Sequence, residues 1–195
     1  MPVEVVTGPT EEPVTLQEAK DHLRVDVASD DTLVQRLIAD AREWAERFTR
    51  RALVTQTWRL WLDEFPDGPG TYGPAIVLPG GKVQSVSSVK YIDAAGVLQT
   101  LAGAEYALVA KDPQKPAQLV PAYGKAWPGT RGEPNAVQVE YVTGYGAAAA
   151  VPAIVRQAIL LHVGWHYENR EAGDKESFLD CLELKLTDAR LFAFA

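Results

Sequence analysis

Residues 31–63 read DTLVQRLIADAREWAERFTRRALVTQTWRLWLD, and a change of pattern within this stretch decides the fold. In its first part apolar side chains recur every three or four positions, which is the spacing of one face of an α-helix. These residues are Leu33, Leu37, Ile38, Ala41, Trp44, Ala45 and Phe48. From Leu53 the period falls to two, and Trp58, Leu60 and Leu62 share one side. The stretch predicts a helix over residues 31–52 followed by a half-buried strand.

A shorter helix is predicted upstream by a capping box. In Thr15-Leu16-Gln17-Glu18 the threonine hydroxyl can accept the Glu18 N–H, and the glutamate can reach back to the Thr15 N–H. This helix is expected to end near Arg24. Ser29 or Asp30 can cap the longer helix that follows, where acidic residues suit the positive helix end.

Short strands separated by turn residues are predicted after the exposed loop FPDGPGTYGP at residues 65–74. Because they are short and close in sequence, we expect an antiparallel meander or a small barrel rather than a parallel sheet. Asp93-Ala94-Ala95-Gly96 predicts a hairpin turn between two of them. The further strand candidates are residues 75–78, 83–93, 98–101, 106–109, 118–121 and 136–143.

An apolar helix is predicted over residues 152–167, with proline at its first position. This helix can pack on the helix of residues 31–52, so the β-rich region becomes an insertion between packed helices. The last stretch is ambiguous. Leu179, Leu182 and Leu186 have helical spacing, whereas Leu182, Leu184 and Leu186 alternate as in a strand.

The predicted fold is therefore α+β, with a helical core, an inserted antiparallel β-rich region and an extended C-terminal tail. The core comprises two N-terminal helices, within residues 1–52, and a C-terminal helix, within residues 147–172. The β-rich insertion covers residues 53–146, and the C-terminal docking tail covers residues 173–195.

Composition and charge narrow the range of functions. The chain has 195 residues, 47% hydrophobic and 23% charged, which is typical of a globular protein and excludes a disordered one. Its net charge of −7 disfavours a protein that grips nucleic-acid phosphates, although an acidic protein could surround DNA without holding it. Cys181 is the single cysteine, which favours a reducing compartment. The N-terminus shows no signal peptide and no stretch is apolar enough to span a bilayer, so we expect synthesis in the cytoplasm and no membrane contact.

Two histidines have a spacing that a metal site can use. His162 and His166 lie four apart on one predicted helix face, which a zinc site can use, but Val163 stands where a zinc protease has its glutamate. A metal-dependent enzyme using these histidines, with a distant residue such as Asp30, stays open as an alternative. The sequence has no nucleophile elbow and no phosphate-binding loop, so we expect neither an enzyme nor a cofactor.

A group of arginines allows two interpretations. Arg36, Arg42, Arg47, Arg50 and Arg51 could touch DNA phosphates, which would suit a DNA-binding regulatory protein. They alternate with acidic residues, so a solvated or subunit-facing surface of ion pairs is the favoured interpretation.

An aromatic pair flanks a glycine turn in Tyr123-Gly124-Lys125-Ala126-Trp127-Pro128. This segment is either a loop folded back on the sheet or an anchor for a neighbouring chain, because Trp and Tyr are favoured at interfaces. The sequence leaves both alternatives open.

The ordered set of these segments resembles the head–tail connector proteins, also called adaptor or head-completion proteins, of long-tailed bacteriophages and prophages. The resemblance runs from about Val14 to Glu171. It is carried by PVTLQEAKDHLRV at 13–25, Asp30-Asp31, LIADAREWAE at 37–46, ALVTQTW at 52–58, VSSVKYID at 86–93, YGKAWP at 123–128, VTGYG at 142–146, Val151-Pro152 and HYENRE at 166–171.

This resemblance implies a structural virion protein. Connectors of this family form a ring of about twelve copies beneath the portal, with head-to-tail contacts between subunits. The ring extends the DNA channel without reading sequence and offers a platform for the stopper and tail. Related connectors occur in gene transfer agents. The protein is thus expected at the head–tail junction of a virion, after assembly in the host cytoplasm.

The resemblance carries over no catalytic, cofactor or metal residue. It implies that the C-terminal segment reaches the portal. The residue types of the arginine group and of the aromatic loop predict further contacts. The candidate partner-interface residues are Arg36, Arg47, Arg50, Arg51, Tyr123, Trp127, Phe178, Leu182, Leu186, Leu191, Phe192 and Phe194.

Overall fold

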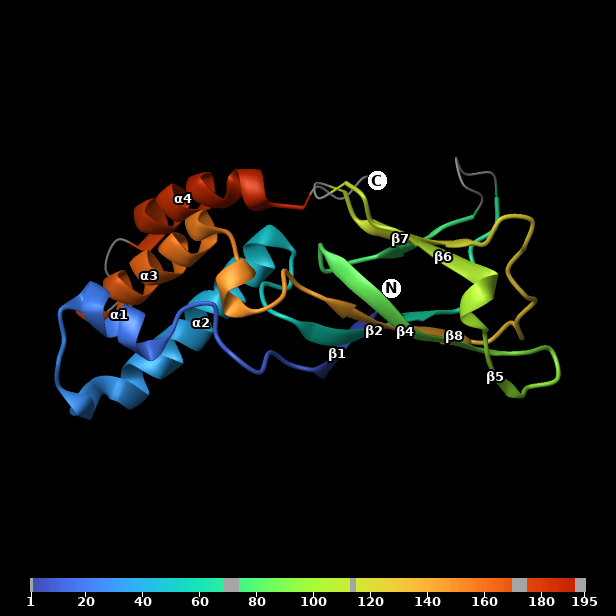
Figure 1. The fold of residues 1–195 in the computed structure, drawn as a ribbon, viewed down its shortest axis with the longest axis horizontal. Helices are drawn as coiled ribbons and strands as arrows, with labels where there is room; N and C mark the ends of the chain where they lie inside the picture. Colours follow the sequence, from blue (N-terminus) through green and yellow to red (C-terminus); the bar gives the residue numbers. More distant parts are fainter. Residues whose placement is uncertain (1, 69–73, 113–114, 170–174, 192–195) are drawn as a thin grey trace. The chain divides into compact units, whose positions relative to one another are not determined.

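A computed structural model describes residues 2–68, 74–112, 115–169 and 175–191 (Figure 1). Within this range the chain forms two compact units. The helical unit comprises residues 9–54 and 145–191, and the β unit comprises residues 2–8 and 55–144. The mixed α+β class predicted from the sequence is confirmed.

Two N-terminal helices begin where the sequence predicts. Helix α1 (Leu16–Leu23) starts with the capping box, in which the Glu18 N–H donates to Thr15 Oγ1 at 3.2 Å and the Thr15 N–H donates to Glu18 Oε2 at 2.8 Å. Helix α2 (Asp31–Thr49) ends earlier than predicted, because Arg50 turns into the left-handed conformation with φ of 57°.

The capping box predicts a pH-dependent stability. The Thr15 N–H holds the pKa of Glu18 below its ordinary value of 4.5; burial opposes this shift, and Arg156 adds to it. A carboxylate with a depressed folded-state pKa stabilises fully above its unfolded pKa and loses that contribution as pH falls through the folded one. We expect Glu18→Gln to destabilise the protein at pH 7 but to converge with the wild type below pH 4.5, as measured by urea denaturation. A difference that stays constant from pH 7 to pH 3 would contradict this.

Helices α2 and α3 (Ala153–Glu168) form the centre of the helical unit. Their fully buried residues include Val34, Ile38, Ala41, Ala45, Val155, Ala158, Ile159 and Val163. At Gly164 an added Cβ would lie 3.4 Å from His22 Nε2, so α1 approaches α3 closely there. The predicted packing of these helices is thus present.

The C-terminal residues differ from the predicted extended tail. Residues Lys175–Leu186 form helix α4, followed by the 3₁₀ turn Thr187–Ala189. Leu182 and Leu186 are buried in the helical core, which resolves the ambiguous spacing in favour of a helix. Leu191 is also buried, and its N–H donates to the carbonyl of Thr49 at 2.9 Å. The tail prediction is wrong for these residues because their leucines complete the core; Phe192 and Phe194 lie outside the described residues.

The β unit contains two open antiparallel sheets. The five-stranded sheet has the order β1-β2-β8-β4-β5, and the three-stranded sheet has the order β3-β7-β6. Antiparallel pairing is confirmed throughout the described strands, and of the two predicted forms the small barrel is wrong. The strands are β1 (Val3–Thr7), β2 (Gln56–Leu62), β3 (Ile76–Leu78), β4 (Val83–Ile92), β5 (Leu98–Thr100), β6 (Tyr106–Val109), β7 (Ala117–Pro121) and β8 (Val137–Thr143).

Inward-facing residues of both sheets form the core of this unit. Leu60, Val139 and Val89 lie side by side across the larger sheet, and all three are fully buried. Ile76, Leu78 and Leu119 contribute from the smaller sheet to the same cluster. This alternation of buried and outward residues is what the period of two predicts.

Strand β1 belongs to the β unit, which differs from the predicted division of the chain. The sequence predicts that residues 1–52 belong to the helical core, but residues 3–7 pair with β2, with Val3 opposite Leu60 and Val5 opposite Trp58. The sequence VEVVT lacks a clean alternation, and all five residues are exposed, so no buried face marked the strand.

Candidate assembly surfaces

The predicted arginine group separates into exposed and buried members. Arg36, Arg47 and Arg50 are exposed on α2 and at its end. Arg51 is only 4% exposed, and its Nε donates to the carbonyl of Ala189 at 2.7 Å. Arg51 therefore holds the turn after α4 and is not a surface residue of this unit.

Arg42 is the centre of a half-buried ion-pair cluster. Its Nε lies 2.9 Å from Glu12 Oε2, its Nη1 lies 2.9 Å from Glu46 Oε2, and its Nη2 lies 3.6 Å from Glu43 Oε1. Burial raises the pKa of Glu12 above its ordinary value, although Arg42 acts in the opposite direction. Burial lowers the pKa of Arg42, but Glu12 and Glu46 outweigh it and the net shift is upward. The cluster fixes the segment before α1 onto α2.

The two aromatic side chains of the loop at residues 123–128 differ in their exposure to solvent. Trp127 is half-buried, stacks on Phe65 with a centroid distance of 4.9 Å, and donates from Nε1 to the carbonyl of Pro74 at 2.7 Å. Tyr123 is fully exposed, while Lys125 Nζ lies 3.1 Å from Glu105 Oε1. Trp127 thus folds back on the unit and Tyr123 is available for a partner.

A shallow groove lies beside Tyr123. It has a volume of about 560 Å³ and is lined by residues of β6, β7 and the loop after β7. Its apolar lining includes Ala107, Val109, Val120 and Pro121. An exposed tyrosine next to an apolar groove is the usual composition of a protein-binding surface.

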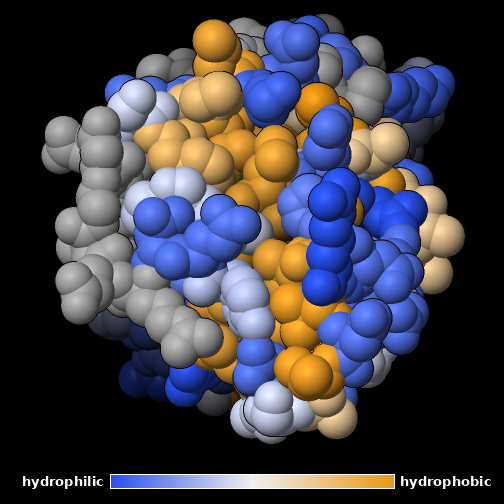
Figure 2. Space-filling model, turned by 90° about the vertical axis from the view of Figure 1, so that its left-hand side faces the viewer, coloured by the Kyte–Doolittle hydropathy of each residue, from blue (hydrophilic) through white to orange (hydrophobic). Residues whose placement is uncertain are grey.

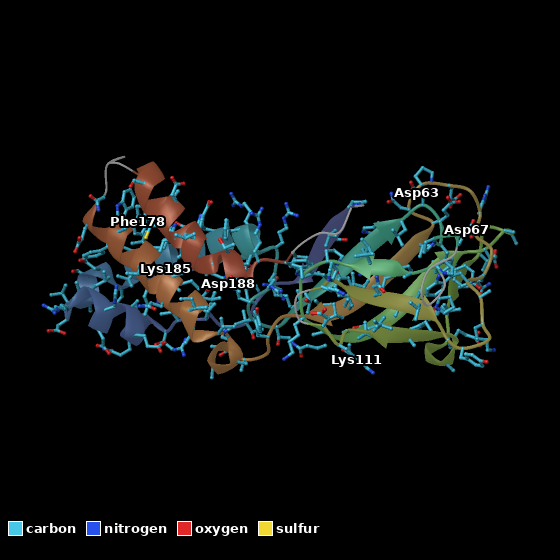
Figure 3. The ribbon with its side chains drawn as sticks, turned by 90° about the horizontal axis from the view of Figure 1, so that it is seen from above. Asp63, Asp67, Lys111, Phe178, Lys185 and Asp188 are labelled. Atoms are coloured by element: carbon cyan, nitrogen blue, oxygen red, sulfur yellow. The ribbon has the colours of Figure 1, made fainter. Side chains whose placement is uncertain are left out.

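The C-terminal candidates lie mainly inside the helical unit. Phe178 is half-buried and stacks on Trp165 with a centroid distance of 5.2 Å, while Leu182, Leu186 and Leu191 are buried. Figure 3 shows Phe178 and Lys185 along α4, with Asp188 in the turn that follows. Leu184 is 78% exposed and is the outward-facing leucine of this helix.

The two histidines lie in an aromatic stack. His162 is buried, its ring centroid lies 5.1 Å from that of Trp44, and the His166 centroid lies 4.4 Å from that of His162. They line a pocket of about 260 Å³ together with Leu37, Asp40, Trp44 and Leu179. Among the residues that the structure describes, no cluster of three or more His, Cys, Asp or Glu side chains could hold a metal ion.

Exposed aliphatic residues mark surfaces that the sequence did not single out. Figure 2 shows apolar residues gathered between hydrophilic ones on a face of the helical unit. In the β unit, Val3 and Val5 on β1 and Val97 and Leu98 at β5 are exposed. Their only sequence signal is a short strand with few charges, a pattern that many buried strands share. In the described part of the chain no helix is both long and apolar enough to cross a membrane.

Comparison with known proteins gives a match to one family model and matches to solved structures. Residues 13–92 match the sequence model of the family described as phage gp6-like head–tail connector protein. No curated protein matches the chain.

Three solved structures share the fold across the whole chain. A chain in the neck of an empty gene transfer agent particle, computed with C6 symmetry, is 22% identical with a TM-score of 0.82. Chains in the virion of a native gene transfer agent particle and in a native neck computed with C12 symmetry are each 24% identical, with TM-scores of 0.76 and 0.69. Each alignment covers 100% of this chain and 98% of the other.

The family match spans α1 and α2 of the helical unit and β2, β3 and β4 of the β unit, so it includes both units. The neck structures extend the likeness in fold to both ends of the chain. Together they support the structural connector role predicted from the sequence. Residues 13–92 thus match the family of phage gp6-like head–tail connector proteins, in agreement with the resemblance predicted from the sequence.

Proposed function

We propose that this protein is a structural subunit of the head–tail junction of a phage or gene transfer agent particle. In this role it forms a ring below the portal, extends the DNA channel, and links the capsid to the stopper and tail. The observation that carries the proposal is the connector-family match over residues 13–92. The neck fold along the rest of the chain supports it.

The proposed ring contains about twelve copies, because a chain of the same fold lies in a neck computed with C12 symmetry. Identical subunits in a closed ring meet through two different surfaces, each on one side of the subunit. The portal above and the stopper or tail-completion protein below are the proposed partners. The protein works in the virion, after assembly in the host cytoplasm.

The net charge of the chain suits a channel through which DNA passes without being bound. A net charge of −7 repels DNA phosphates, so a duplex can slide past without being retained. Exposed Arg36, Arg47 and Arg50 are better placed to meet acidic residues of a neighbouring subunit or of the portal. The proposed function requires no catalytic residue, cofactor or metal.

Tyr123 and its groove are the proposed contact of the β unit. Exposed tyrosines beside apolar grooves often supply a large share of binding free energy. We expect Tyr123→Ala to weaken ring or portal assembly by about 1–2 kcal/mol, which is roughly a tenfold loss of affinity. Sedimentation of mixtures with the portal checks this, and Trp127→Ala is unsuitable as a control because it would disturb packing. Val77→Ala serves as the control, because Val77 is 39% exposed on β3 and does not line the groove, and equal assembly of both variants would remove Tyr123 from the interface.

The deciding experiment measures the mass of the purified protein alone and with the portal protein of the same locus. A ring, or a monomer that joins the portal in stoichiometric amount, would support the connector function. A stable small oligomer that ignores the portal would contradict it. A steeply salt-dependent affinity for DNA would instead favour a DNA-binding regulator.

A further inference from the structure

The five-stranded sheet ends in two open edges, β1 and β5, and neither strand contains a lysine or a proline. Edge strands in monomeric proteins usually carry lysines or prolines that prevent pairing with another chain. Here β1 reads VEVVT and β5 reads LQT, so Glu4 is the one charged residue on either strand. Its carboxylate lies 3.5 Å from Arg59 on β2, within its own sheet. A bulge affects β1 only between Val5 and Thr7, which leaves residues 3–5 regular.

Exposed aliphatic residues concentrate at these two edges. The described part of the chain exposes ten large hydrophobic residues, and Val3, Val5, Val6, Val97 and Leu98 lie on or beside β1 and β5. Val5 is 54% exposed and Leu98 is 56% exposed, so each edge offers apolar surface that a single subunit leaves in water. Such concentration favours burial against another chain.

The directions of β1 and β5 allow these two edges to pair between subunits that are related by a rotation about a ring axis. Every neighbouring pair in the sheet is antiparallel, and the sheet has five strands, so β1 and β5 run in the same direction. A rotation about a ring axis can therefore place β1 of one subunit beside β5 of the next as a parallel pair. The two edges differ, which is what a head-to-tail contact in a closed ring requires.

Side-chain alternation agrees with this join. Val3 lies in the cross-strand row of Leu60, Val139 and Val89, and the Leu101 N–H donates to the carbonyl of Val89 at 2.8 Å. The row therefore runs from Val3 at one edge to Leu101 at the other. Glu4 and Leu98 both lie on the opposite face, because Glu4 pairs with Arg59 and Leu98 pairs with Ile92. Joining the edges continues the inner face with two apolar residues, Val3 and Leu101, and keeps Glu4 and Leu98 together on the outer face.

We propose that β1 of each subunit adds to β5 of its neighbour, so that the five-stranded sheets of the ring form one continuous sheet. The occupant of the open edge is thus a second copy of this chain. The inference rests on the ring of the proposed function and names the contact that builds it. Since β5 has only three residues, the join is short, and assembly is expected where the portal aligns the subunits.

Charged substitutions at the edges test the join. Val5→Lys and Leu98→Lys each place a charge where a neighbouring strand would pair, so we expect at least a tenfold loss of ring formation on the portal with the monomer fold intact by circular dichroism. Val77→Lys is the matched control, because Val77 is 39% exposed on β3, an edge strand of the other sheet. Loss of assembly with Val77→Lys but not with the edge variants would overturn the proposal.

Crosslinking gives a second, direct test. In a Cys181→Ser background, Glu4→Cys with Leu98→Cys places thiols on one face at the two edges, and a short bismaleimide should yield a ladder of covalent multimers from portal-bound rings. Val77→Cys with Leu98→Cys should yield none. Two results together would overturn the edge join and leave the connector function intact. Rings would form normally without giving a crosslinked ladder, and the lysine variants would assemble as well as the wild type. Absence of any ring or portal binding by the wild type would overturn both.

Discussion

Replacing Leu186 with alanine is expected to lower the free energy of unfolding by about 2–5 kcal/mol. Leu186 is fully buried in the helical core, so the substitution removes packed methyl groups and leaves a cavity between α4 and the helices beneath it. Chemical denaturation followed by far-UV circular dichroism measures this change. A loss of stability of this size would show that α4 is part of the folded unit and not a free docking segment.

The same helix provides the control. Leu184 lies two residues away and is 78% exposed, so Leu184→Ala should change stability by less than about 0.5 kcal/mol. If both variants were equally mild, α4 would contribute little to the core. A portal-binding defect in Leu184→Ala, with normal stability, would instead identify the outward face of α4 as a contact.

Replacing Arg42 with alanine is expected to destabilise the helical unit by about 2 kcal/mol. Removing one partner of a fully buried ion pair costs about 3–5 kcal/mol, but Glu12 is one-third exposed, so solvent reduces the penalty. The loss arises because Glu12 and Glu46 would face each other without the guanidinium between them. Urea denaturation at pH 7 measures this change in the free energy of unfolding.

Arg47→Ala is the matched control for the Arg42 variant. Arg47 is exposed on the same helix, so its loss should change stability by less than about 0.5 kcal/mol. Acidification offers a second check, since protonating Glu12 removes the repulsion that the Arg42 variant suffers. A stability loss that is unchanged at pH 4 would assign the effect to lost packing of the arginine stem.

Strong periodic patterns allowed most of the fold to be predicted from the sequence. The capping box located the start of α1, and the helical stripe located α2. Strands β4, β6, β7 and β8 lie within a residue or two of their predicted ranges. In these elements one face is buried, so apolar residues recur at the regular spacing of a helix or a strand.

The missed elements lack such a face or depend on distant contacts. Every residue of β1 is exposed, so its position is set by pairing with β2, more than fifty residues away, which no local pattern records. Helix α4 has leucines compatible with either period, and only the cavity that they fill determines the outcome.

The candidate site was predictable by residue type but not by exposure. Arginine and tryptophan are enriched at interfaces, yet Arg51 is buried and bonded to Ala189, and Trp127 is half-buried and stacked on Phe65. Tyr123 and the arginines Arg36, Arg47 and Arg50 remain at the surface. Whether a large side chain faces inward or outward depends on tertiary packing, which composition does not encode.

Both units are built from separated parts of the chain, and this has a consequence for synthesis. The β unit needs β8 at residues 137–143 to join β2 and β4, and the helical unit needs α3, which ends at Glu168, beneath α4. A ribosome therefore releases most of the polypeptide before either core can close. Nascent chains should stay dependent on chaperones until late in translation, and truncated products should aggregate instead of competing for the portal.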